Sequence, residues 1–139
     1  MKRCGKLKGR TCADGSTQRQ HFSKEQTSSP TVSTDALMLF IIIDAYEKRD
    51  VVTANVVGAY LNADMPDFTV MKPTGDAFHI MCRVNPKYEE IVTMKKGKKV
   101  LYVQLLKVLY GCVQSALLWY NVFTNTLKEA GFVLKPTKQ

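Results

Sequence analysis

The sequence lacks the patterns that several common classes of protein require. Four cysteines occur far apart in the chain: Cys4, Cys12, Cys82 and Cys112. None belongs to the C-x-x-C pairing of zinc sites and redox motifs, so we expect free thiols. The longest apolar run, Ala36 to Ile43, is shorter than the roughly 18 residues of a membrane span. The basic N-terminus lacks the apolar stretch of a signal peptide, so we expect an intracellular protein, cytoplasmic or nuclear.

Acidic residues are also scarce relative to basic ones. The chain has 20 Lys and Arg against 12 Asp and Glu, which gives a net charge of +8 and a pI near 9.4. The electric field of such a positive charge attracts polyanions and favours nucleic acid as partner, although many small basic proteins bind no specific partner. With 139 residues, 45% of them hydrophobic, the chain is long enough for one domain with a core. His21 and His79 stand alone, without the i, i+4 partner of a metal site.

The first 30 residues are the most basic part of the chain. Seven Lys and Arg against Asp14 and Glu25 give a local charge of +5 among many Gly, Ser, Thr and Gln residues. We expect this segment to be weakly ordered by itself. The turn signal Asp14-Gly15 predicts a short hairpin in which residues 8–12 pair with residues 18–22.

Two segments have the apolar spacing of helices. Ser33-Thr34-Asp35 offers an N-cap and predicts a helix over residues 34–48. Apolar residues cover this helix almost all round, so we expect it to pack on more than one side. A second helix is predicted from residue 114 or 115 to about residue 130, because Trp119, Phe123 and Leu127 are four residues apart and Gly131 supplies a stop.

The remaining chain predicts strands and turns. Residues 51–57 are mostly β-branched and end at Gly58, which predicts a buried strand. The other predicted elements are strands over residues 68–72, 78–84 and 100–106, a short helical piece over residues 85–91, and an exposed hairpin tip at Lys95 to Lys99. Strands interleaved with two helices predict an α+β domain.

Two motifs about fifty residues apart show a resemblance to a known family. The first is Ala54-Asn55-Val56-Val57-Gly58-Ala59-Tyr60-Leu61. The second is Leu109-Tyr110-Gly111-Cys112-Val113-Gln114-Ser115-Ala116, followed by Trp119-Tyr120. Together they resemble the copia-type retrotransposon reverse transcriptase, an RNA-directed DNA polymerase. Family members carry Asp at position 55 and read roughly S-L-Y-G-L-K-Q-x-P-x-x-W-Y at the second motif, from which Ala116, Leu118 and Cys112-Val113 depart.

The resemblance covers roughly residues 6 to 136 and implies a fold. That fold is the fingers and partial palm of a reverse transcriptase, an antiparallel sheet with two main packing helices. Residues 1–30 then form a basic fingers-like segment, in which Lys8 to Gly15 followed by Gln18 is similar to the family's K-A-R-L-V-A-K-G-x-x-Q. Residues 31–139 form the partial palm and fingers, which stop before the second catalytic motif. The expected protein is therefore a fragment derived from a transposable element.

The departure at Asn55 bears on catalysis. Polymerisation needs two divalent cations about 4 Å apart, held by carboxylates, and Mg²⁺ is the cofactor that the family implies. The neutral amide of Asn55 lacks the charge that offsets a dication. The family's second element, a Y-V-D-D type turn, is absent, because the sequence stops at Gln139 before reaching it. Asp50 would lie roughly 16 Å from position 55, on the opposite face of a strand, and Asp64 corresponds to a structural or surface acidic residue of the family. Neither can replace the missing ligand, so we expect no metal site and an inactive fragment.

Other residues have roles that the resemblance implies. Tyr60 corresponds to an aromatic gate that rejects the sugar 2′-hydroxyl of a wrong nucleotide, and Gln114 to a glutamine that hydrogen-bonds the incoming deoxynucleoside triphosphate. Lys8 and Arg10 correspond to basic residues that touch template or triphosphate. Without the resemblance, Tyr60 reads as a core tyrosine and Gln114 as a polar residue at a helix start.

A cluster of four lysines suits contact with the phosphates of an RNA template or an RNA/DNA hybrid: Lys95, Lys96, Lys98 and Lys99. A solvated hairpin tip is the alternative for this cluster. For the whole chain the alternatives to an inactive polymerase fragment are a basic nucleic-acid-binding module without chemistry and a structural remnant that neither binds nor catalyses.

Overall fold

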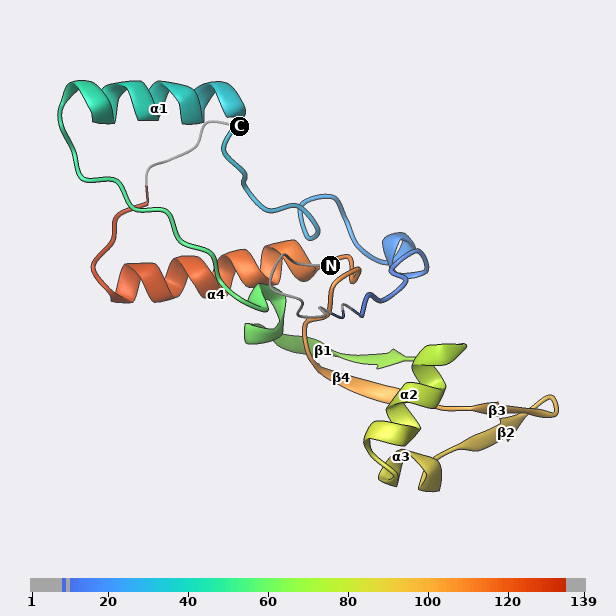
Figure 1. The fold of residues 1–139 in the computed structure, drawn as a ribbon. Coiled ribbons are helices and arrows are strands. Elements are labelled where there is room, and N and C mark those ends of the chain that lie inside the picture. The colour runs from blue at the N-terminus through green and yellow to red at the C-terminus, as the bar shows by residue number, and fades with distance from the viewer. Residues whose placement is uncertain (1–8, 10, 135–139) are drawn as a thin grey trace.

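The structure is a computed structural model that describes residue 9 and residues 11–134 (Figure 1). The elements follow the order η1 (Gln18–Gln20), α1 (Thr34–Tyr46), η2 (Ala59–Asn62), β1 (Asp64–Met71), α2 (Asp76–Val84), α3 (Lys87–Glu90), β2 (Thr93–Lys95), β3 (Lys98–Val100), β4 (Val103–Lys107) and α4 (Ser115–Glu129), where η marks a 3₁₀ helix. The mixture of helices and antiparallel sheet confirms the α+β class. The strands form two separate two-stranded sheets, β1–β4 and β2–β3, in place of one sheet.

The β1–β4 sheet lies at the centre of the molecule (Figure 1). Thr69 pairs with Leu105 and Met71 with Val103, while the register shifts between Asp64 and Thr69. Pro66 lies inside this shift and has no N–H to donate to a ladder, which accounts for the interruption. The predicted strand at residues 68–72 is therefore confirmed and begins earlier. The predicted strand at residues 100–106 is divided between the end of β3 and β4.

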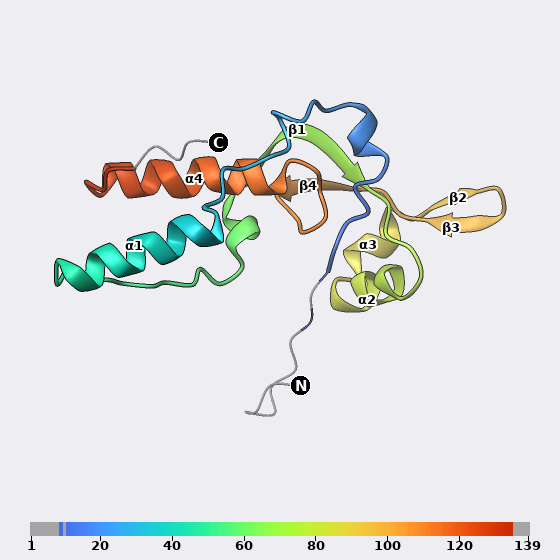
Figure 2. The ribbon, with the colours of Figure 1, turned by 90° about the horizontal axis from the view of Figure 1, so that it is seen from above.

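The β2–β3 hairpin projects from the central sheet (Figure 2). Its two turn residues, Lys96 and Gly97, have φ of 51° and 74°. Positive φ at both turn positions is the geometry of a tight hairpin with right-handed twist. This confirms the predicted hairpin tip around Gly97.

Helix α4 forms as predicted. The rings of Trp119 and Phe123 stack with centroids 5.4 Å apart on one face. At its end Gly131 has a φ of 87°, and the amides of Gly131 and Phe132 donate to the carbonyls of Lys128 and Leu127. This is the Schellman arrangement that a C′ glycine allows.

The core is small and is divided between the two ends of the central sheet. Val108 and Ala63 are fully buried at the end next to η2, and Leu101 is fully buried at the other end, before β4 begins. Helix η2 packs against α4 and against β4. The amide of Val108 donates to the carbonyl of Ala63 over 2.9 Å, which ties the end of η2 to the strand. The central sheet therefore carries buried residues at both of its ends.

Helix α1 forms as predicted but is not packed as predicted. Ser33 accepts a hydrogen bond from the Ala36 amide, and this cap explains where the helix begins. No residue of α1 is buried, and Leu39 and Ile42 are 59% and 65% exposed. The expectation that it packs on more than one side, as one of two main packing helices, is wrong for the described chain. Its apolar residues have no sheet to cover, because no strand forms next to α1.

Two predicted strands are wrong. Residues 51–56 are irregular and exposed, with Val52 88% exposed, because no neighbouring strand is available for their backbone groups. Residues 78–84 belong to helix α2. Phe78 and Cys82 face inward four residues apart, which is helical spacing, and Asp76 and Arg83 lie at the ends that the helix dipole favours.

The predicted hairpin of residues 8–12 with 18–22 is also wrong for the described residues. Gln18–Gln20 is a short 3₁₀ helix, and Cys12 pairs with Tyr110 in an isolated parallel bridge. The turn itself is present, because the Asp14 carboxylate accepts a hydrogen bond from the Ser16 amide over 3.0 Å. Residues 8 and 10 lie outside the described part. The predicted helical piece at residues 85–91 is confirmed as α3, with the Asn85 side chain accepting from the Lys87 amide.

Candidate functional site

Three distant segments meet at Tyr110. The amide of Ala13 donates to the Tyr110 carbonyl over 2.6 Å. On the other side the ring of Tyr60 lies 4.7 Å from the Tyr110 ring, tilted by 51°. The segments that the sequence singled out near residues 8–18, 54–61 and 109–116 therefore converge on one residue, and we call this meeting point the Tyr110 junction.

Two glycines allow the backbones of the junction to approach closely. A Cβ on Gly111 would lie 2.0 Å from the Ala13 carbonyl oxygen, and Gly111 also has a φ of 90°. A Cβ on Gly15 would lie 2.3 Å from the Gly111 carbonyl oxygen. Side chains are excluded at both positions, so the sequence needs glycine there for the segments to touch.

Hydrogen bonds hold the loop between β4 and α4 in place. The Gln18 side-chain carbonyl accepts from the Val113 amide over 3.1 Å, across 95 residues of sequence. The hydroxyl of Ser115, which is 3% exposed, donates to the Leu109 carbonyl over 2.7 Å. The loop that carries the second motif is thus fixed both to the N-terminal segment and to itself.

An open hollow of about 640 Å³ lies beside the junction. It is bounded by residues 13–16 and 111–113 together with Arg19 and Thr27. Hydrogen bonds from the Ser16 amide and then the Ser16 hydroxyl hold the pKa of the Asp14 carboxyl below its usual value, with a smaller contribution from Arg19. Burial raises the pKa of the Cys112 thiol, so this cysteine stays protonated at neutral pH. The hollow has backbone groups, one cation and one carboxylate to offer a polar ligand.

The predicted nucleotide residues lie on elements that are packed together. Tyr60 is half-buried on η2, which begins after Gly58 in the left-handed conformation, with a φ of 63°. Gln114 is half-buried directly before α4, and its side chain does not cap that helix. Neither residue lines the hollow beside the junction.

The other predicted site residues lie elsewhere. Asn55 is exposed, on the irregular segment that leads to η2. The lysine cluster lies on the β2–β3 hairpin, at the opposite end of the molecule from α1 and α4 (Figure 1). Lys8 and Arg10 lie outside the described residues, so their predicted contacts stay predictions.

The donor set around Asn55 does not fit Mg²⁺. Within residues 11–134, no three His, Cys, Asp or Glu side chains lie close enough to hold a metal ion. A hard cation requires charged oxygen ligands, and the amide at position 55 contributes a neutral one. These residues therefore do not support a chemical step through a bound Mg²⁺.

Sequence reasoning missed Tyr110 as the centre of the site, although this residue belongs to the second family motif, at residues 109–116. Its role depends on backbone contacts with Cys12 and Ala13, which residue identity does not reveal. The available signal was the pair Gly15 and Gly111, since a glycine in each of two motifs indicates a close approach.

Comparison with known proteins gives one match. The family model described as reverse transcriptase (RNA-dependent DNA polymerase) matches residues 1–139. No curated protein and no solved structure matches the chain. In the described part of the chain no helix has the length and apolar character needed to cross a membrane.

Proposed function

Because the chain belongs to the reverse transcriptase (RNA-dependent DNA polymerase) family, we propose that it is the fingers and front palm of a copia-type enzyme. In this proposal residues 1–30 are the fingers-like segment and residues 31–139 the partial palm and fingers. The chain binds nucleic acid and a deoxynucleoside triphosphate, but polymerises poorly because its first metal ligand is an amide.

The observation that supports this proposal is the convergence at Tyr110. The family resemblance rests on two motifs and extends to the N-terminal segment, and Cys12, Tyr60 and Tyr110 bring one residue of each into contact. Segments that only fill a core would be joined by apolar side chains. Here the contacts involve a backbone bridge, a glycine pair and a buried serine, which is the construction expected where loop geometry must be fixed for a ligand.

The nucleotide would be held by residues of η2 and the start of α4. Tyr60 is braced by the Tyr110 ring, and a braced ring can exclude a 2′-hydroxyl because steric selection requires a wall that does not yield. Gln114 has a side-chain amide that is not used for capping and can hydrogen-bond a nucleotide. Lys8 and Arg10 would contact the triphosphate or template.

The substitution at position 55 accounts for the proposed loss of activity. An amide oxygen can coordinate Mg²⁺ but does not offset its charge, and a metal ligand is worth several kcal/mol of transition-state stabilisation. A deficit of that size lowers the rate by several orders of magnitude.

The test is primer extension on an RNA template with Mg²⁺, using this chain fused to a complete downstream palm. We expect Asn55→Asp to raise the extension rate by about three orders of magnitude. The matched control is Asn85→Asp, which adds the same charge between α2 and α3 and keeps the oxygen that accepts from Lys87. Equal rates for the unchanged fusion and Asn55→Asp would show that the lost charge is not the cause.

A second candidate is a nucleic-acid-binding module without chemistry. It is favoured by the exposed position of Asn55 and by the absence of a metal-holding cluster among the described residues. Filter binding of RNA between 50 and 200 mM salt, concentrations at which phosphate contacts are sensitive, should show a steep decline in affinity. Affinity equal to that of a neutral control protein at both salt concentrations would eliminate this candidate.

A further inference from the structure

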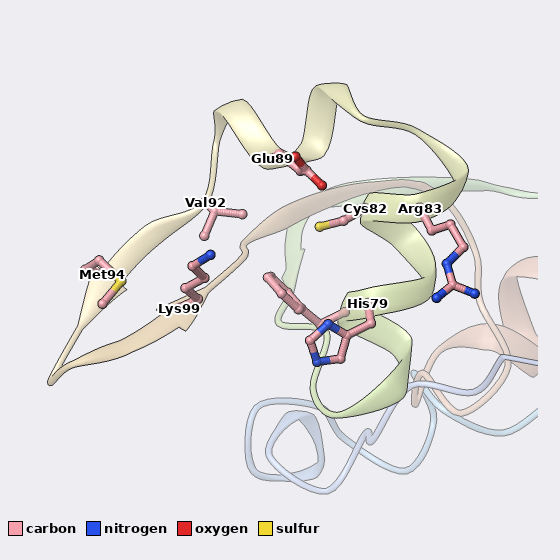
Figure 3. A pocket seen from close by; sticks show the side chains of 8 residues that line it. His79, Cys82, Arg83, Glu89, Val92, Met94 and Lys99 are labelled. Atoms are coloured by element: carbon pink, nitrogen blue, oxygen red, sulfur yellow. The ribbon is translucent and has the colours of Figure 1, made fainter.

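Two open hollows adjoin each other between helices α2 and α3 and the β2–β3 hairpin. The larger has a volume of about 710 Å³ and the smaller about 480 Å³. Phe78, His79 and Lys99 line both, so the two hollows are parts of one depression. We call this depression the basic groove. Figure 3 shows its larger part, with His79 and Arg83 coming from α2 and Lys99 reaching from the hairpin toward Val92.

The charge of the basic groove is predominantly positive. Its lining contains four permanent cations and one carboxylate, Glu89. The cations are Lys72, Arg83, Lys98 and Lys99. All four are exposed, and within residues 11–134 no ion pair neutralises any of them. Unpaired cations around a depression concentrate anions there more than cations spread over a convex surface.

The lysines of the hairpin are not equivalent. Lys98 and Lys99 line the basic groove, whereas Lys95 and Lys96 do not. The Lys95 ammonium lies 3.4 Å from the Tyr102 hydroxyl and 5.9 Å from the centre of its ring. Lys96 occupies the turn, with a φ of 51°. The structure thus divides a cluster that looked uniform in the sequence into two pairs.

The floor of the basic groove is apolar and aromatic. Phe78 is half-buried, and the His79 ring meets it edge-on with centroids 5.3 Å apart. Val92, Met94 and Cys82 complete the lining of the larger hollow. A volume of this size is within the roughly 300–1,000 Å³ of pockets that enclose a small organic ligand, and one nucleotide is such a ligand.

We propose that the basic groove binds a single-stranded nucleic acid, with the cations on its phosphates and a base against Phe78. A cationic track with an aromatic platform is how proteins bind single strands without reading sequence. In a duplex the bases are stacked on each other and leave nothing for the recessed ring of Phe78 to contact. The proposal depends on the proposed function only in taking nucleic acid as the partner, and it concerns a site separate from Tyr60 and Gln114.

The test is fluorescence anisotropy of a labelled 12-nucleotide mixed-sequence RNA with the full chain in EDTA, from 50 to 200 mM NaCl. Lys98→Gln with Lys99→Gln is compared with Lys95→Gln with Lys96→Gln, which removes the same charge from the same hairpin. We expect the first pair to weaken binding at least tenfold and to reduce the salt slope by about 1.4, the contribution of two phosphate contacts on a single strand. The second pair should change affinity by less than about threefold.

Two further variants separate stacking from charge. Phe78→Leu keeps an apolar side chain and should weaken binding about tenfold without changing the salt slope, because stacking does not release counterions. Glu89→Gln removes the carboxylate of the groove and should tighten binding about threefold. Circular dichroism of each variant verifies that it is folded.

Three results would overturn the proposal: equal losses for the two lysine pairs, a duplex bound as tightly as the single strand, or no binding by the unchanged chain. Equal losses would leave nucleic-acid binding itself intact and assign it to the overall charge. Because the assay contains no divalent metal and involves no extension, failure of the primer-extension test would not alter its outcome.

Discussion

The Tyr110 junction and helix α1 are both built from segments rich in apolar residues, but they are packed very differently. Around the junction Val108 is fully buried and Cys112 and Ser115 are nearly so, whereas in α1 every residue is at least partly exposed. The irregular segment at residues 51–56, which follows α1, is also exposed although most of its residues are β-branched. Apolar composition therefore does not decide burial in this chain, because a helix or strand is buried only where another element supplies the opposite surface.

The largest expected effect is that of removing a buried side chain, which is compared with the same type of substitution on α1. Leu101→Ala removes a fully buried side chain and should lower the free energy of unfolding by roughly 2–5 kcal/mol. Leu39→Ala on α1, where the side chain is 59% exposed, should change it by less than about 0.5 kcal/mol. Urea unfolding followed by circular dichroism measures both. Similar losses would mean that α1 has a packing partner in solution.

The next effect tests the close approach at the junction. Gly111→Ala introduces a Cβ at positive φ and against the Ala13 carbonyl, and we expect a loss of about 3 kcal/mol. Gly97→Ala is the control, since its φ is also positive but nothing lies within 4 Å of the new Cβ, so about 1 kcal/mol is expected. If the two substitutions cost the same, the contact between residues 13 and 111 contributes nothing to stability.

A smaller effect concerns the reactivity of the cysteines. Cys12 is exposed at the edge of the junction, while Cys112 is buried and burial raises the pKa of its thiol. Iodoacetamide at neutral pH should modify Cys12 well before Cys112, because the thiolate is the reactive form and must be accessible. Peptide mass spectrometry measures the two rates, with Cys82 on α2 as a buried reference. Rates that become equal only in urea would confirm the difference as a property of the fold.

The smallest effect is a dependence on pH near the junction. The pKa of Asp14 is lowered in the folded chain, chiefly by hydrogen bonds from Ser16, so its ionised form stabilises the fold. This contribution is complete above the ordinary value of 3.8 and is lost as the pH falls below it through the folded pKa. Asp14→Asn keeps the acceptor oxygen but does not titrate. The difference in urea midpoint between the two proteins should therefore shrink as the medium is acidified, and a constant difference would contradict the assignment.

The elements that could be predicted from sequence are those with complete local signals. Helix α4 has its apolar spacing and Gly131, helix α1 has the Ser33 cap, and the β2–β3 hairpin has its turn at Gly97. These signals act over a few residues and do not depend on the rest of the chain. The strand predicted at residues 51–57 failed because a strand requires a neighbour, and nothing in its own residues indicates whether one exists.

The sequence supplied candidate site residues, whose roles stay predictions, but not their arrangement. Tyr60 and Gln114 followed from the family motifs, and the lysines of the hairpin from composition. What the motifs did not reveal was the bond from Val113 to Gln18 or the division of the lysines by the basic groove. Both depend on residues far apart in sequence, so only the folded chain brings them together.

The bridge between Cys12 and Tyr110 also constrains the order of events during synthesis. The segment around Cys12 is synthesised before the surface on which it docks, which follows almost a hundred residues later. Pairing Cys12 with Tyr110 requires closure of a long loop, and this closure is slower than the formation of local helices and hairpins. Cys12 and Ala13 therefore cannot dock until the β4–α4 loop has been synthesised, and we expect them to be accessible to proteases during that interval.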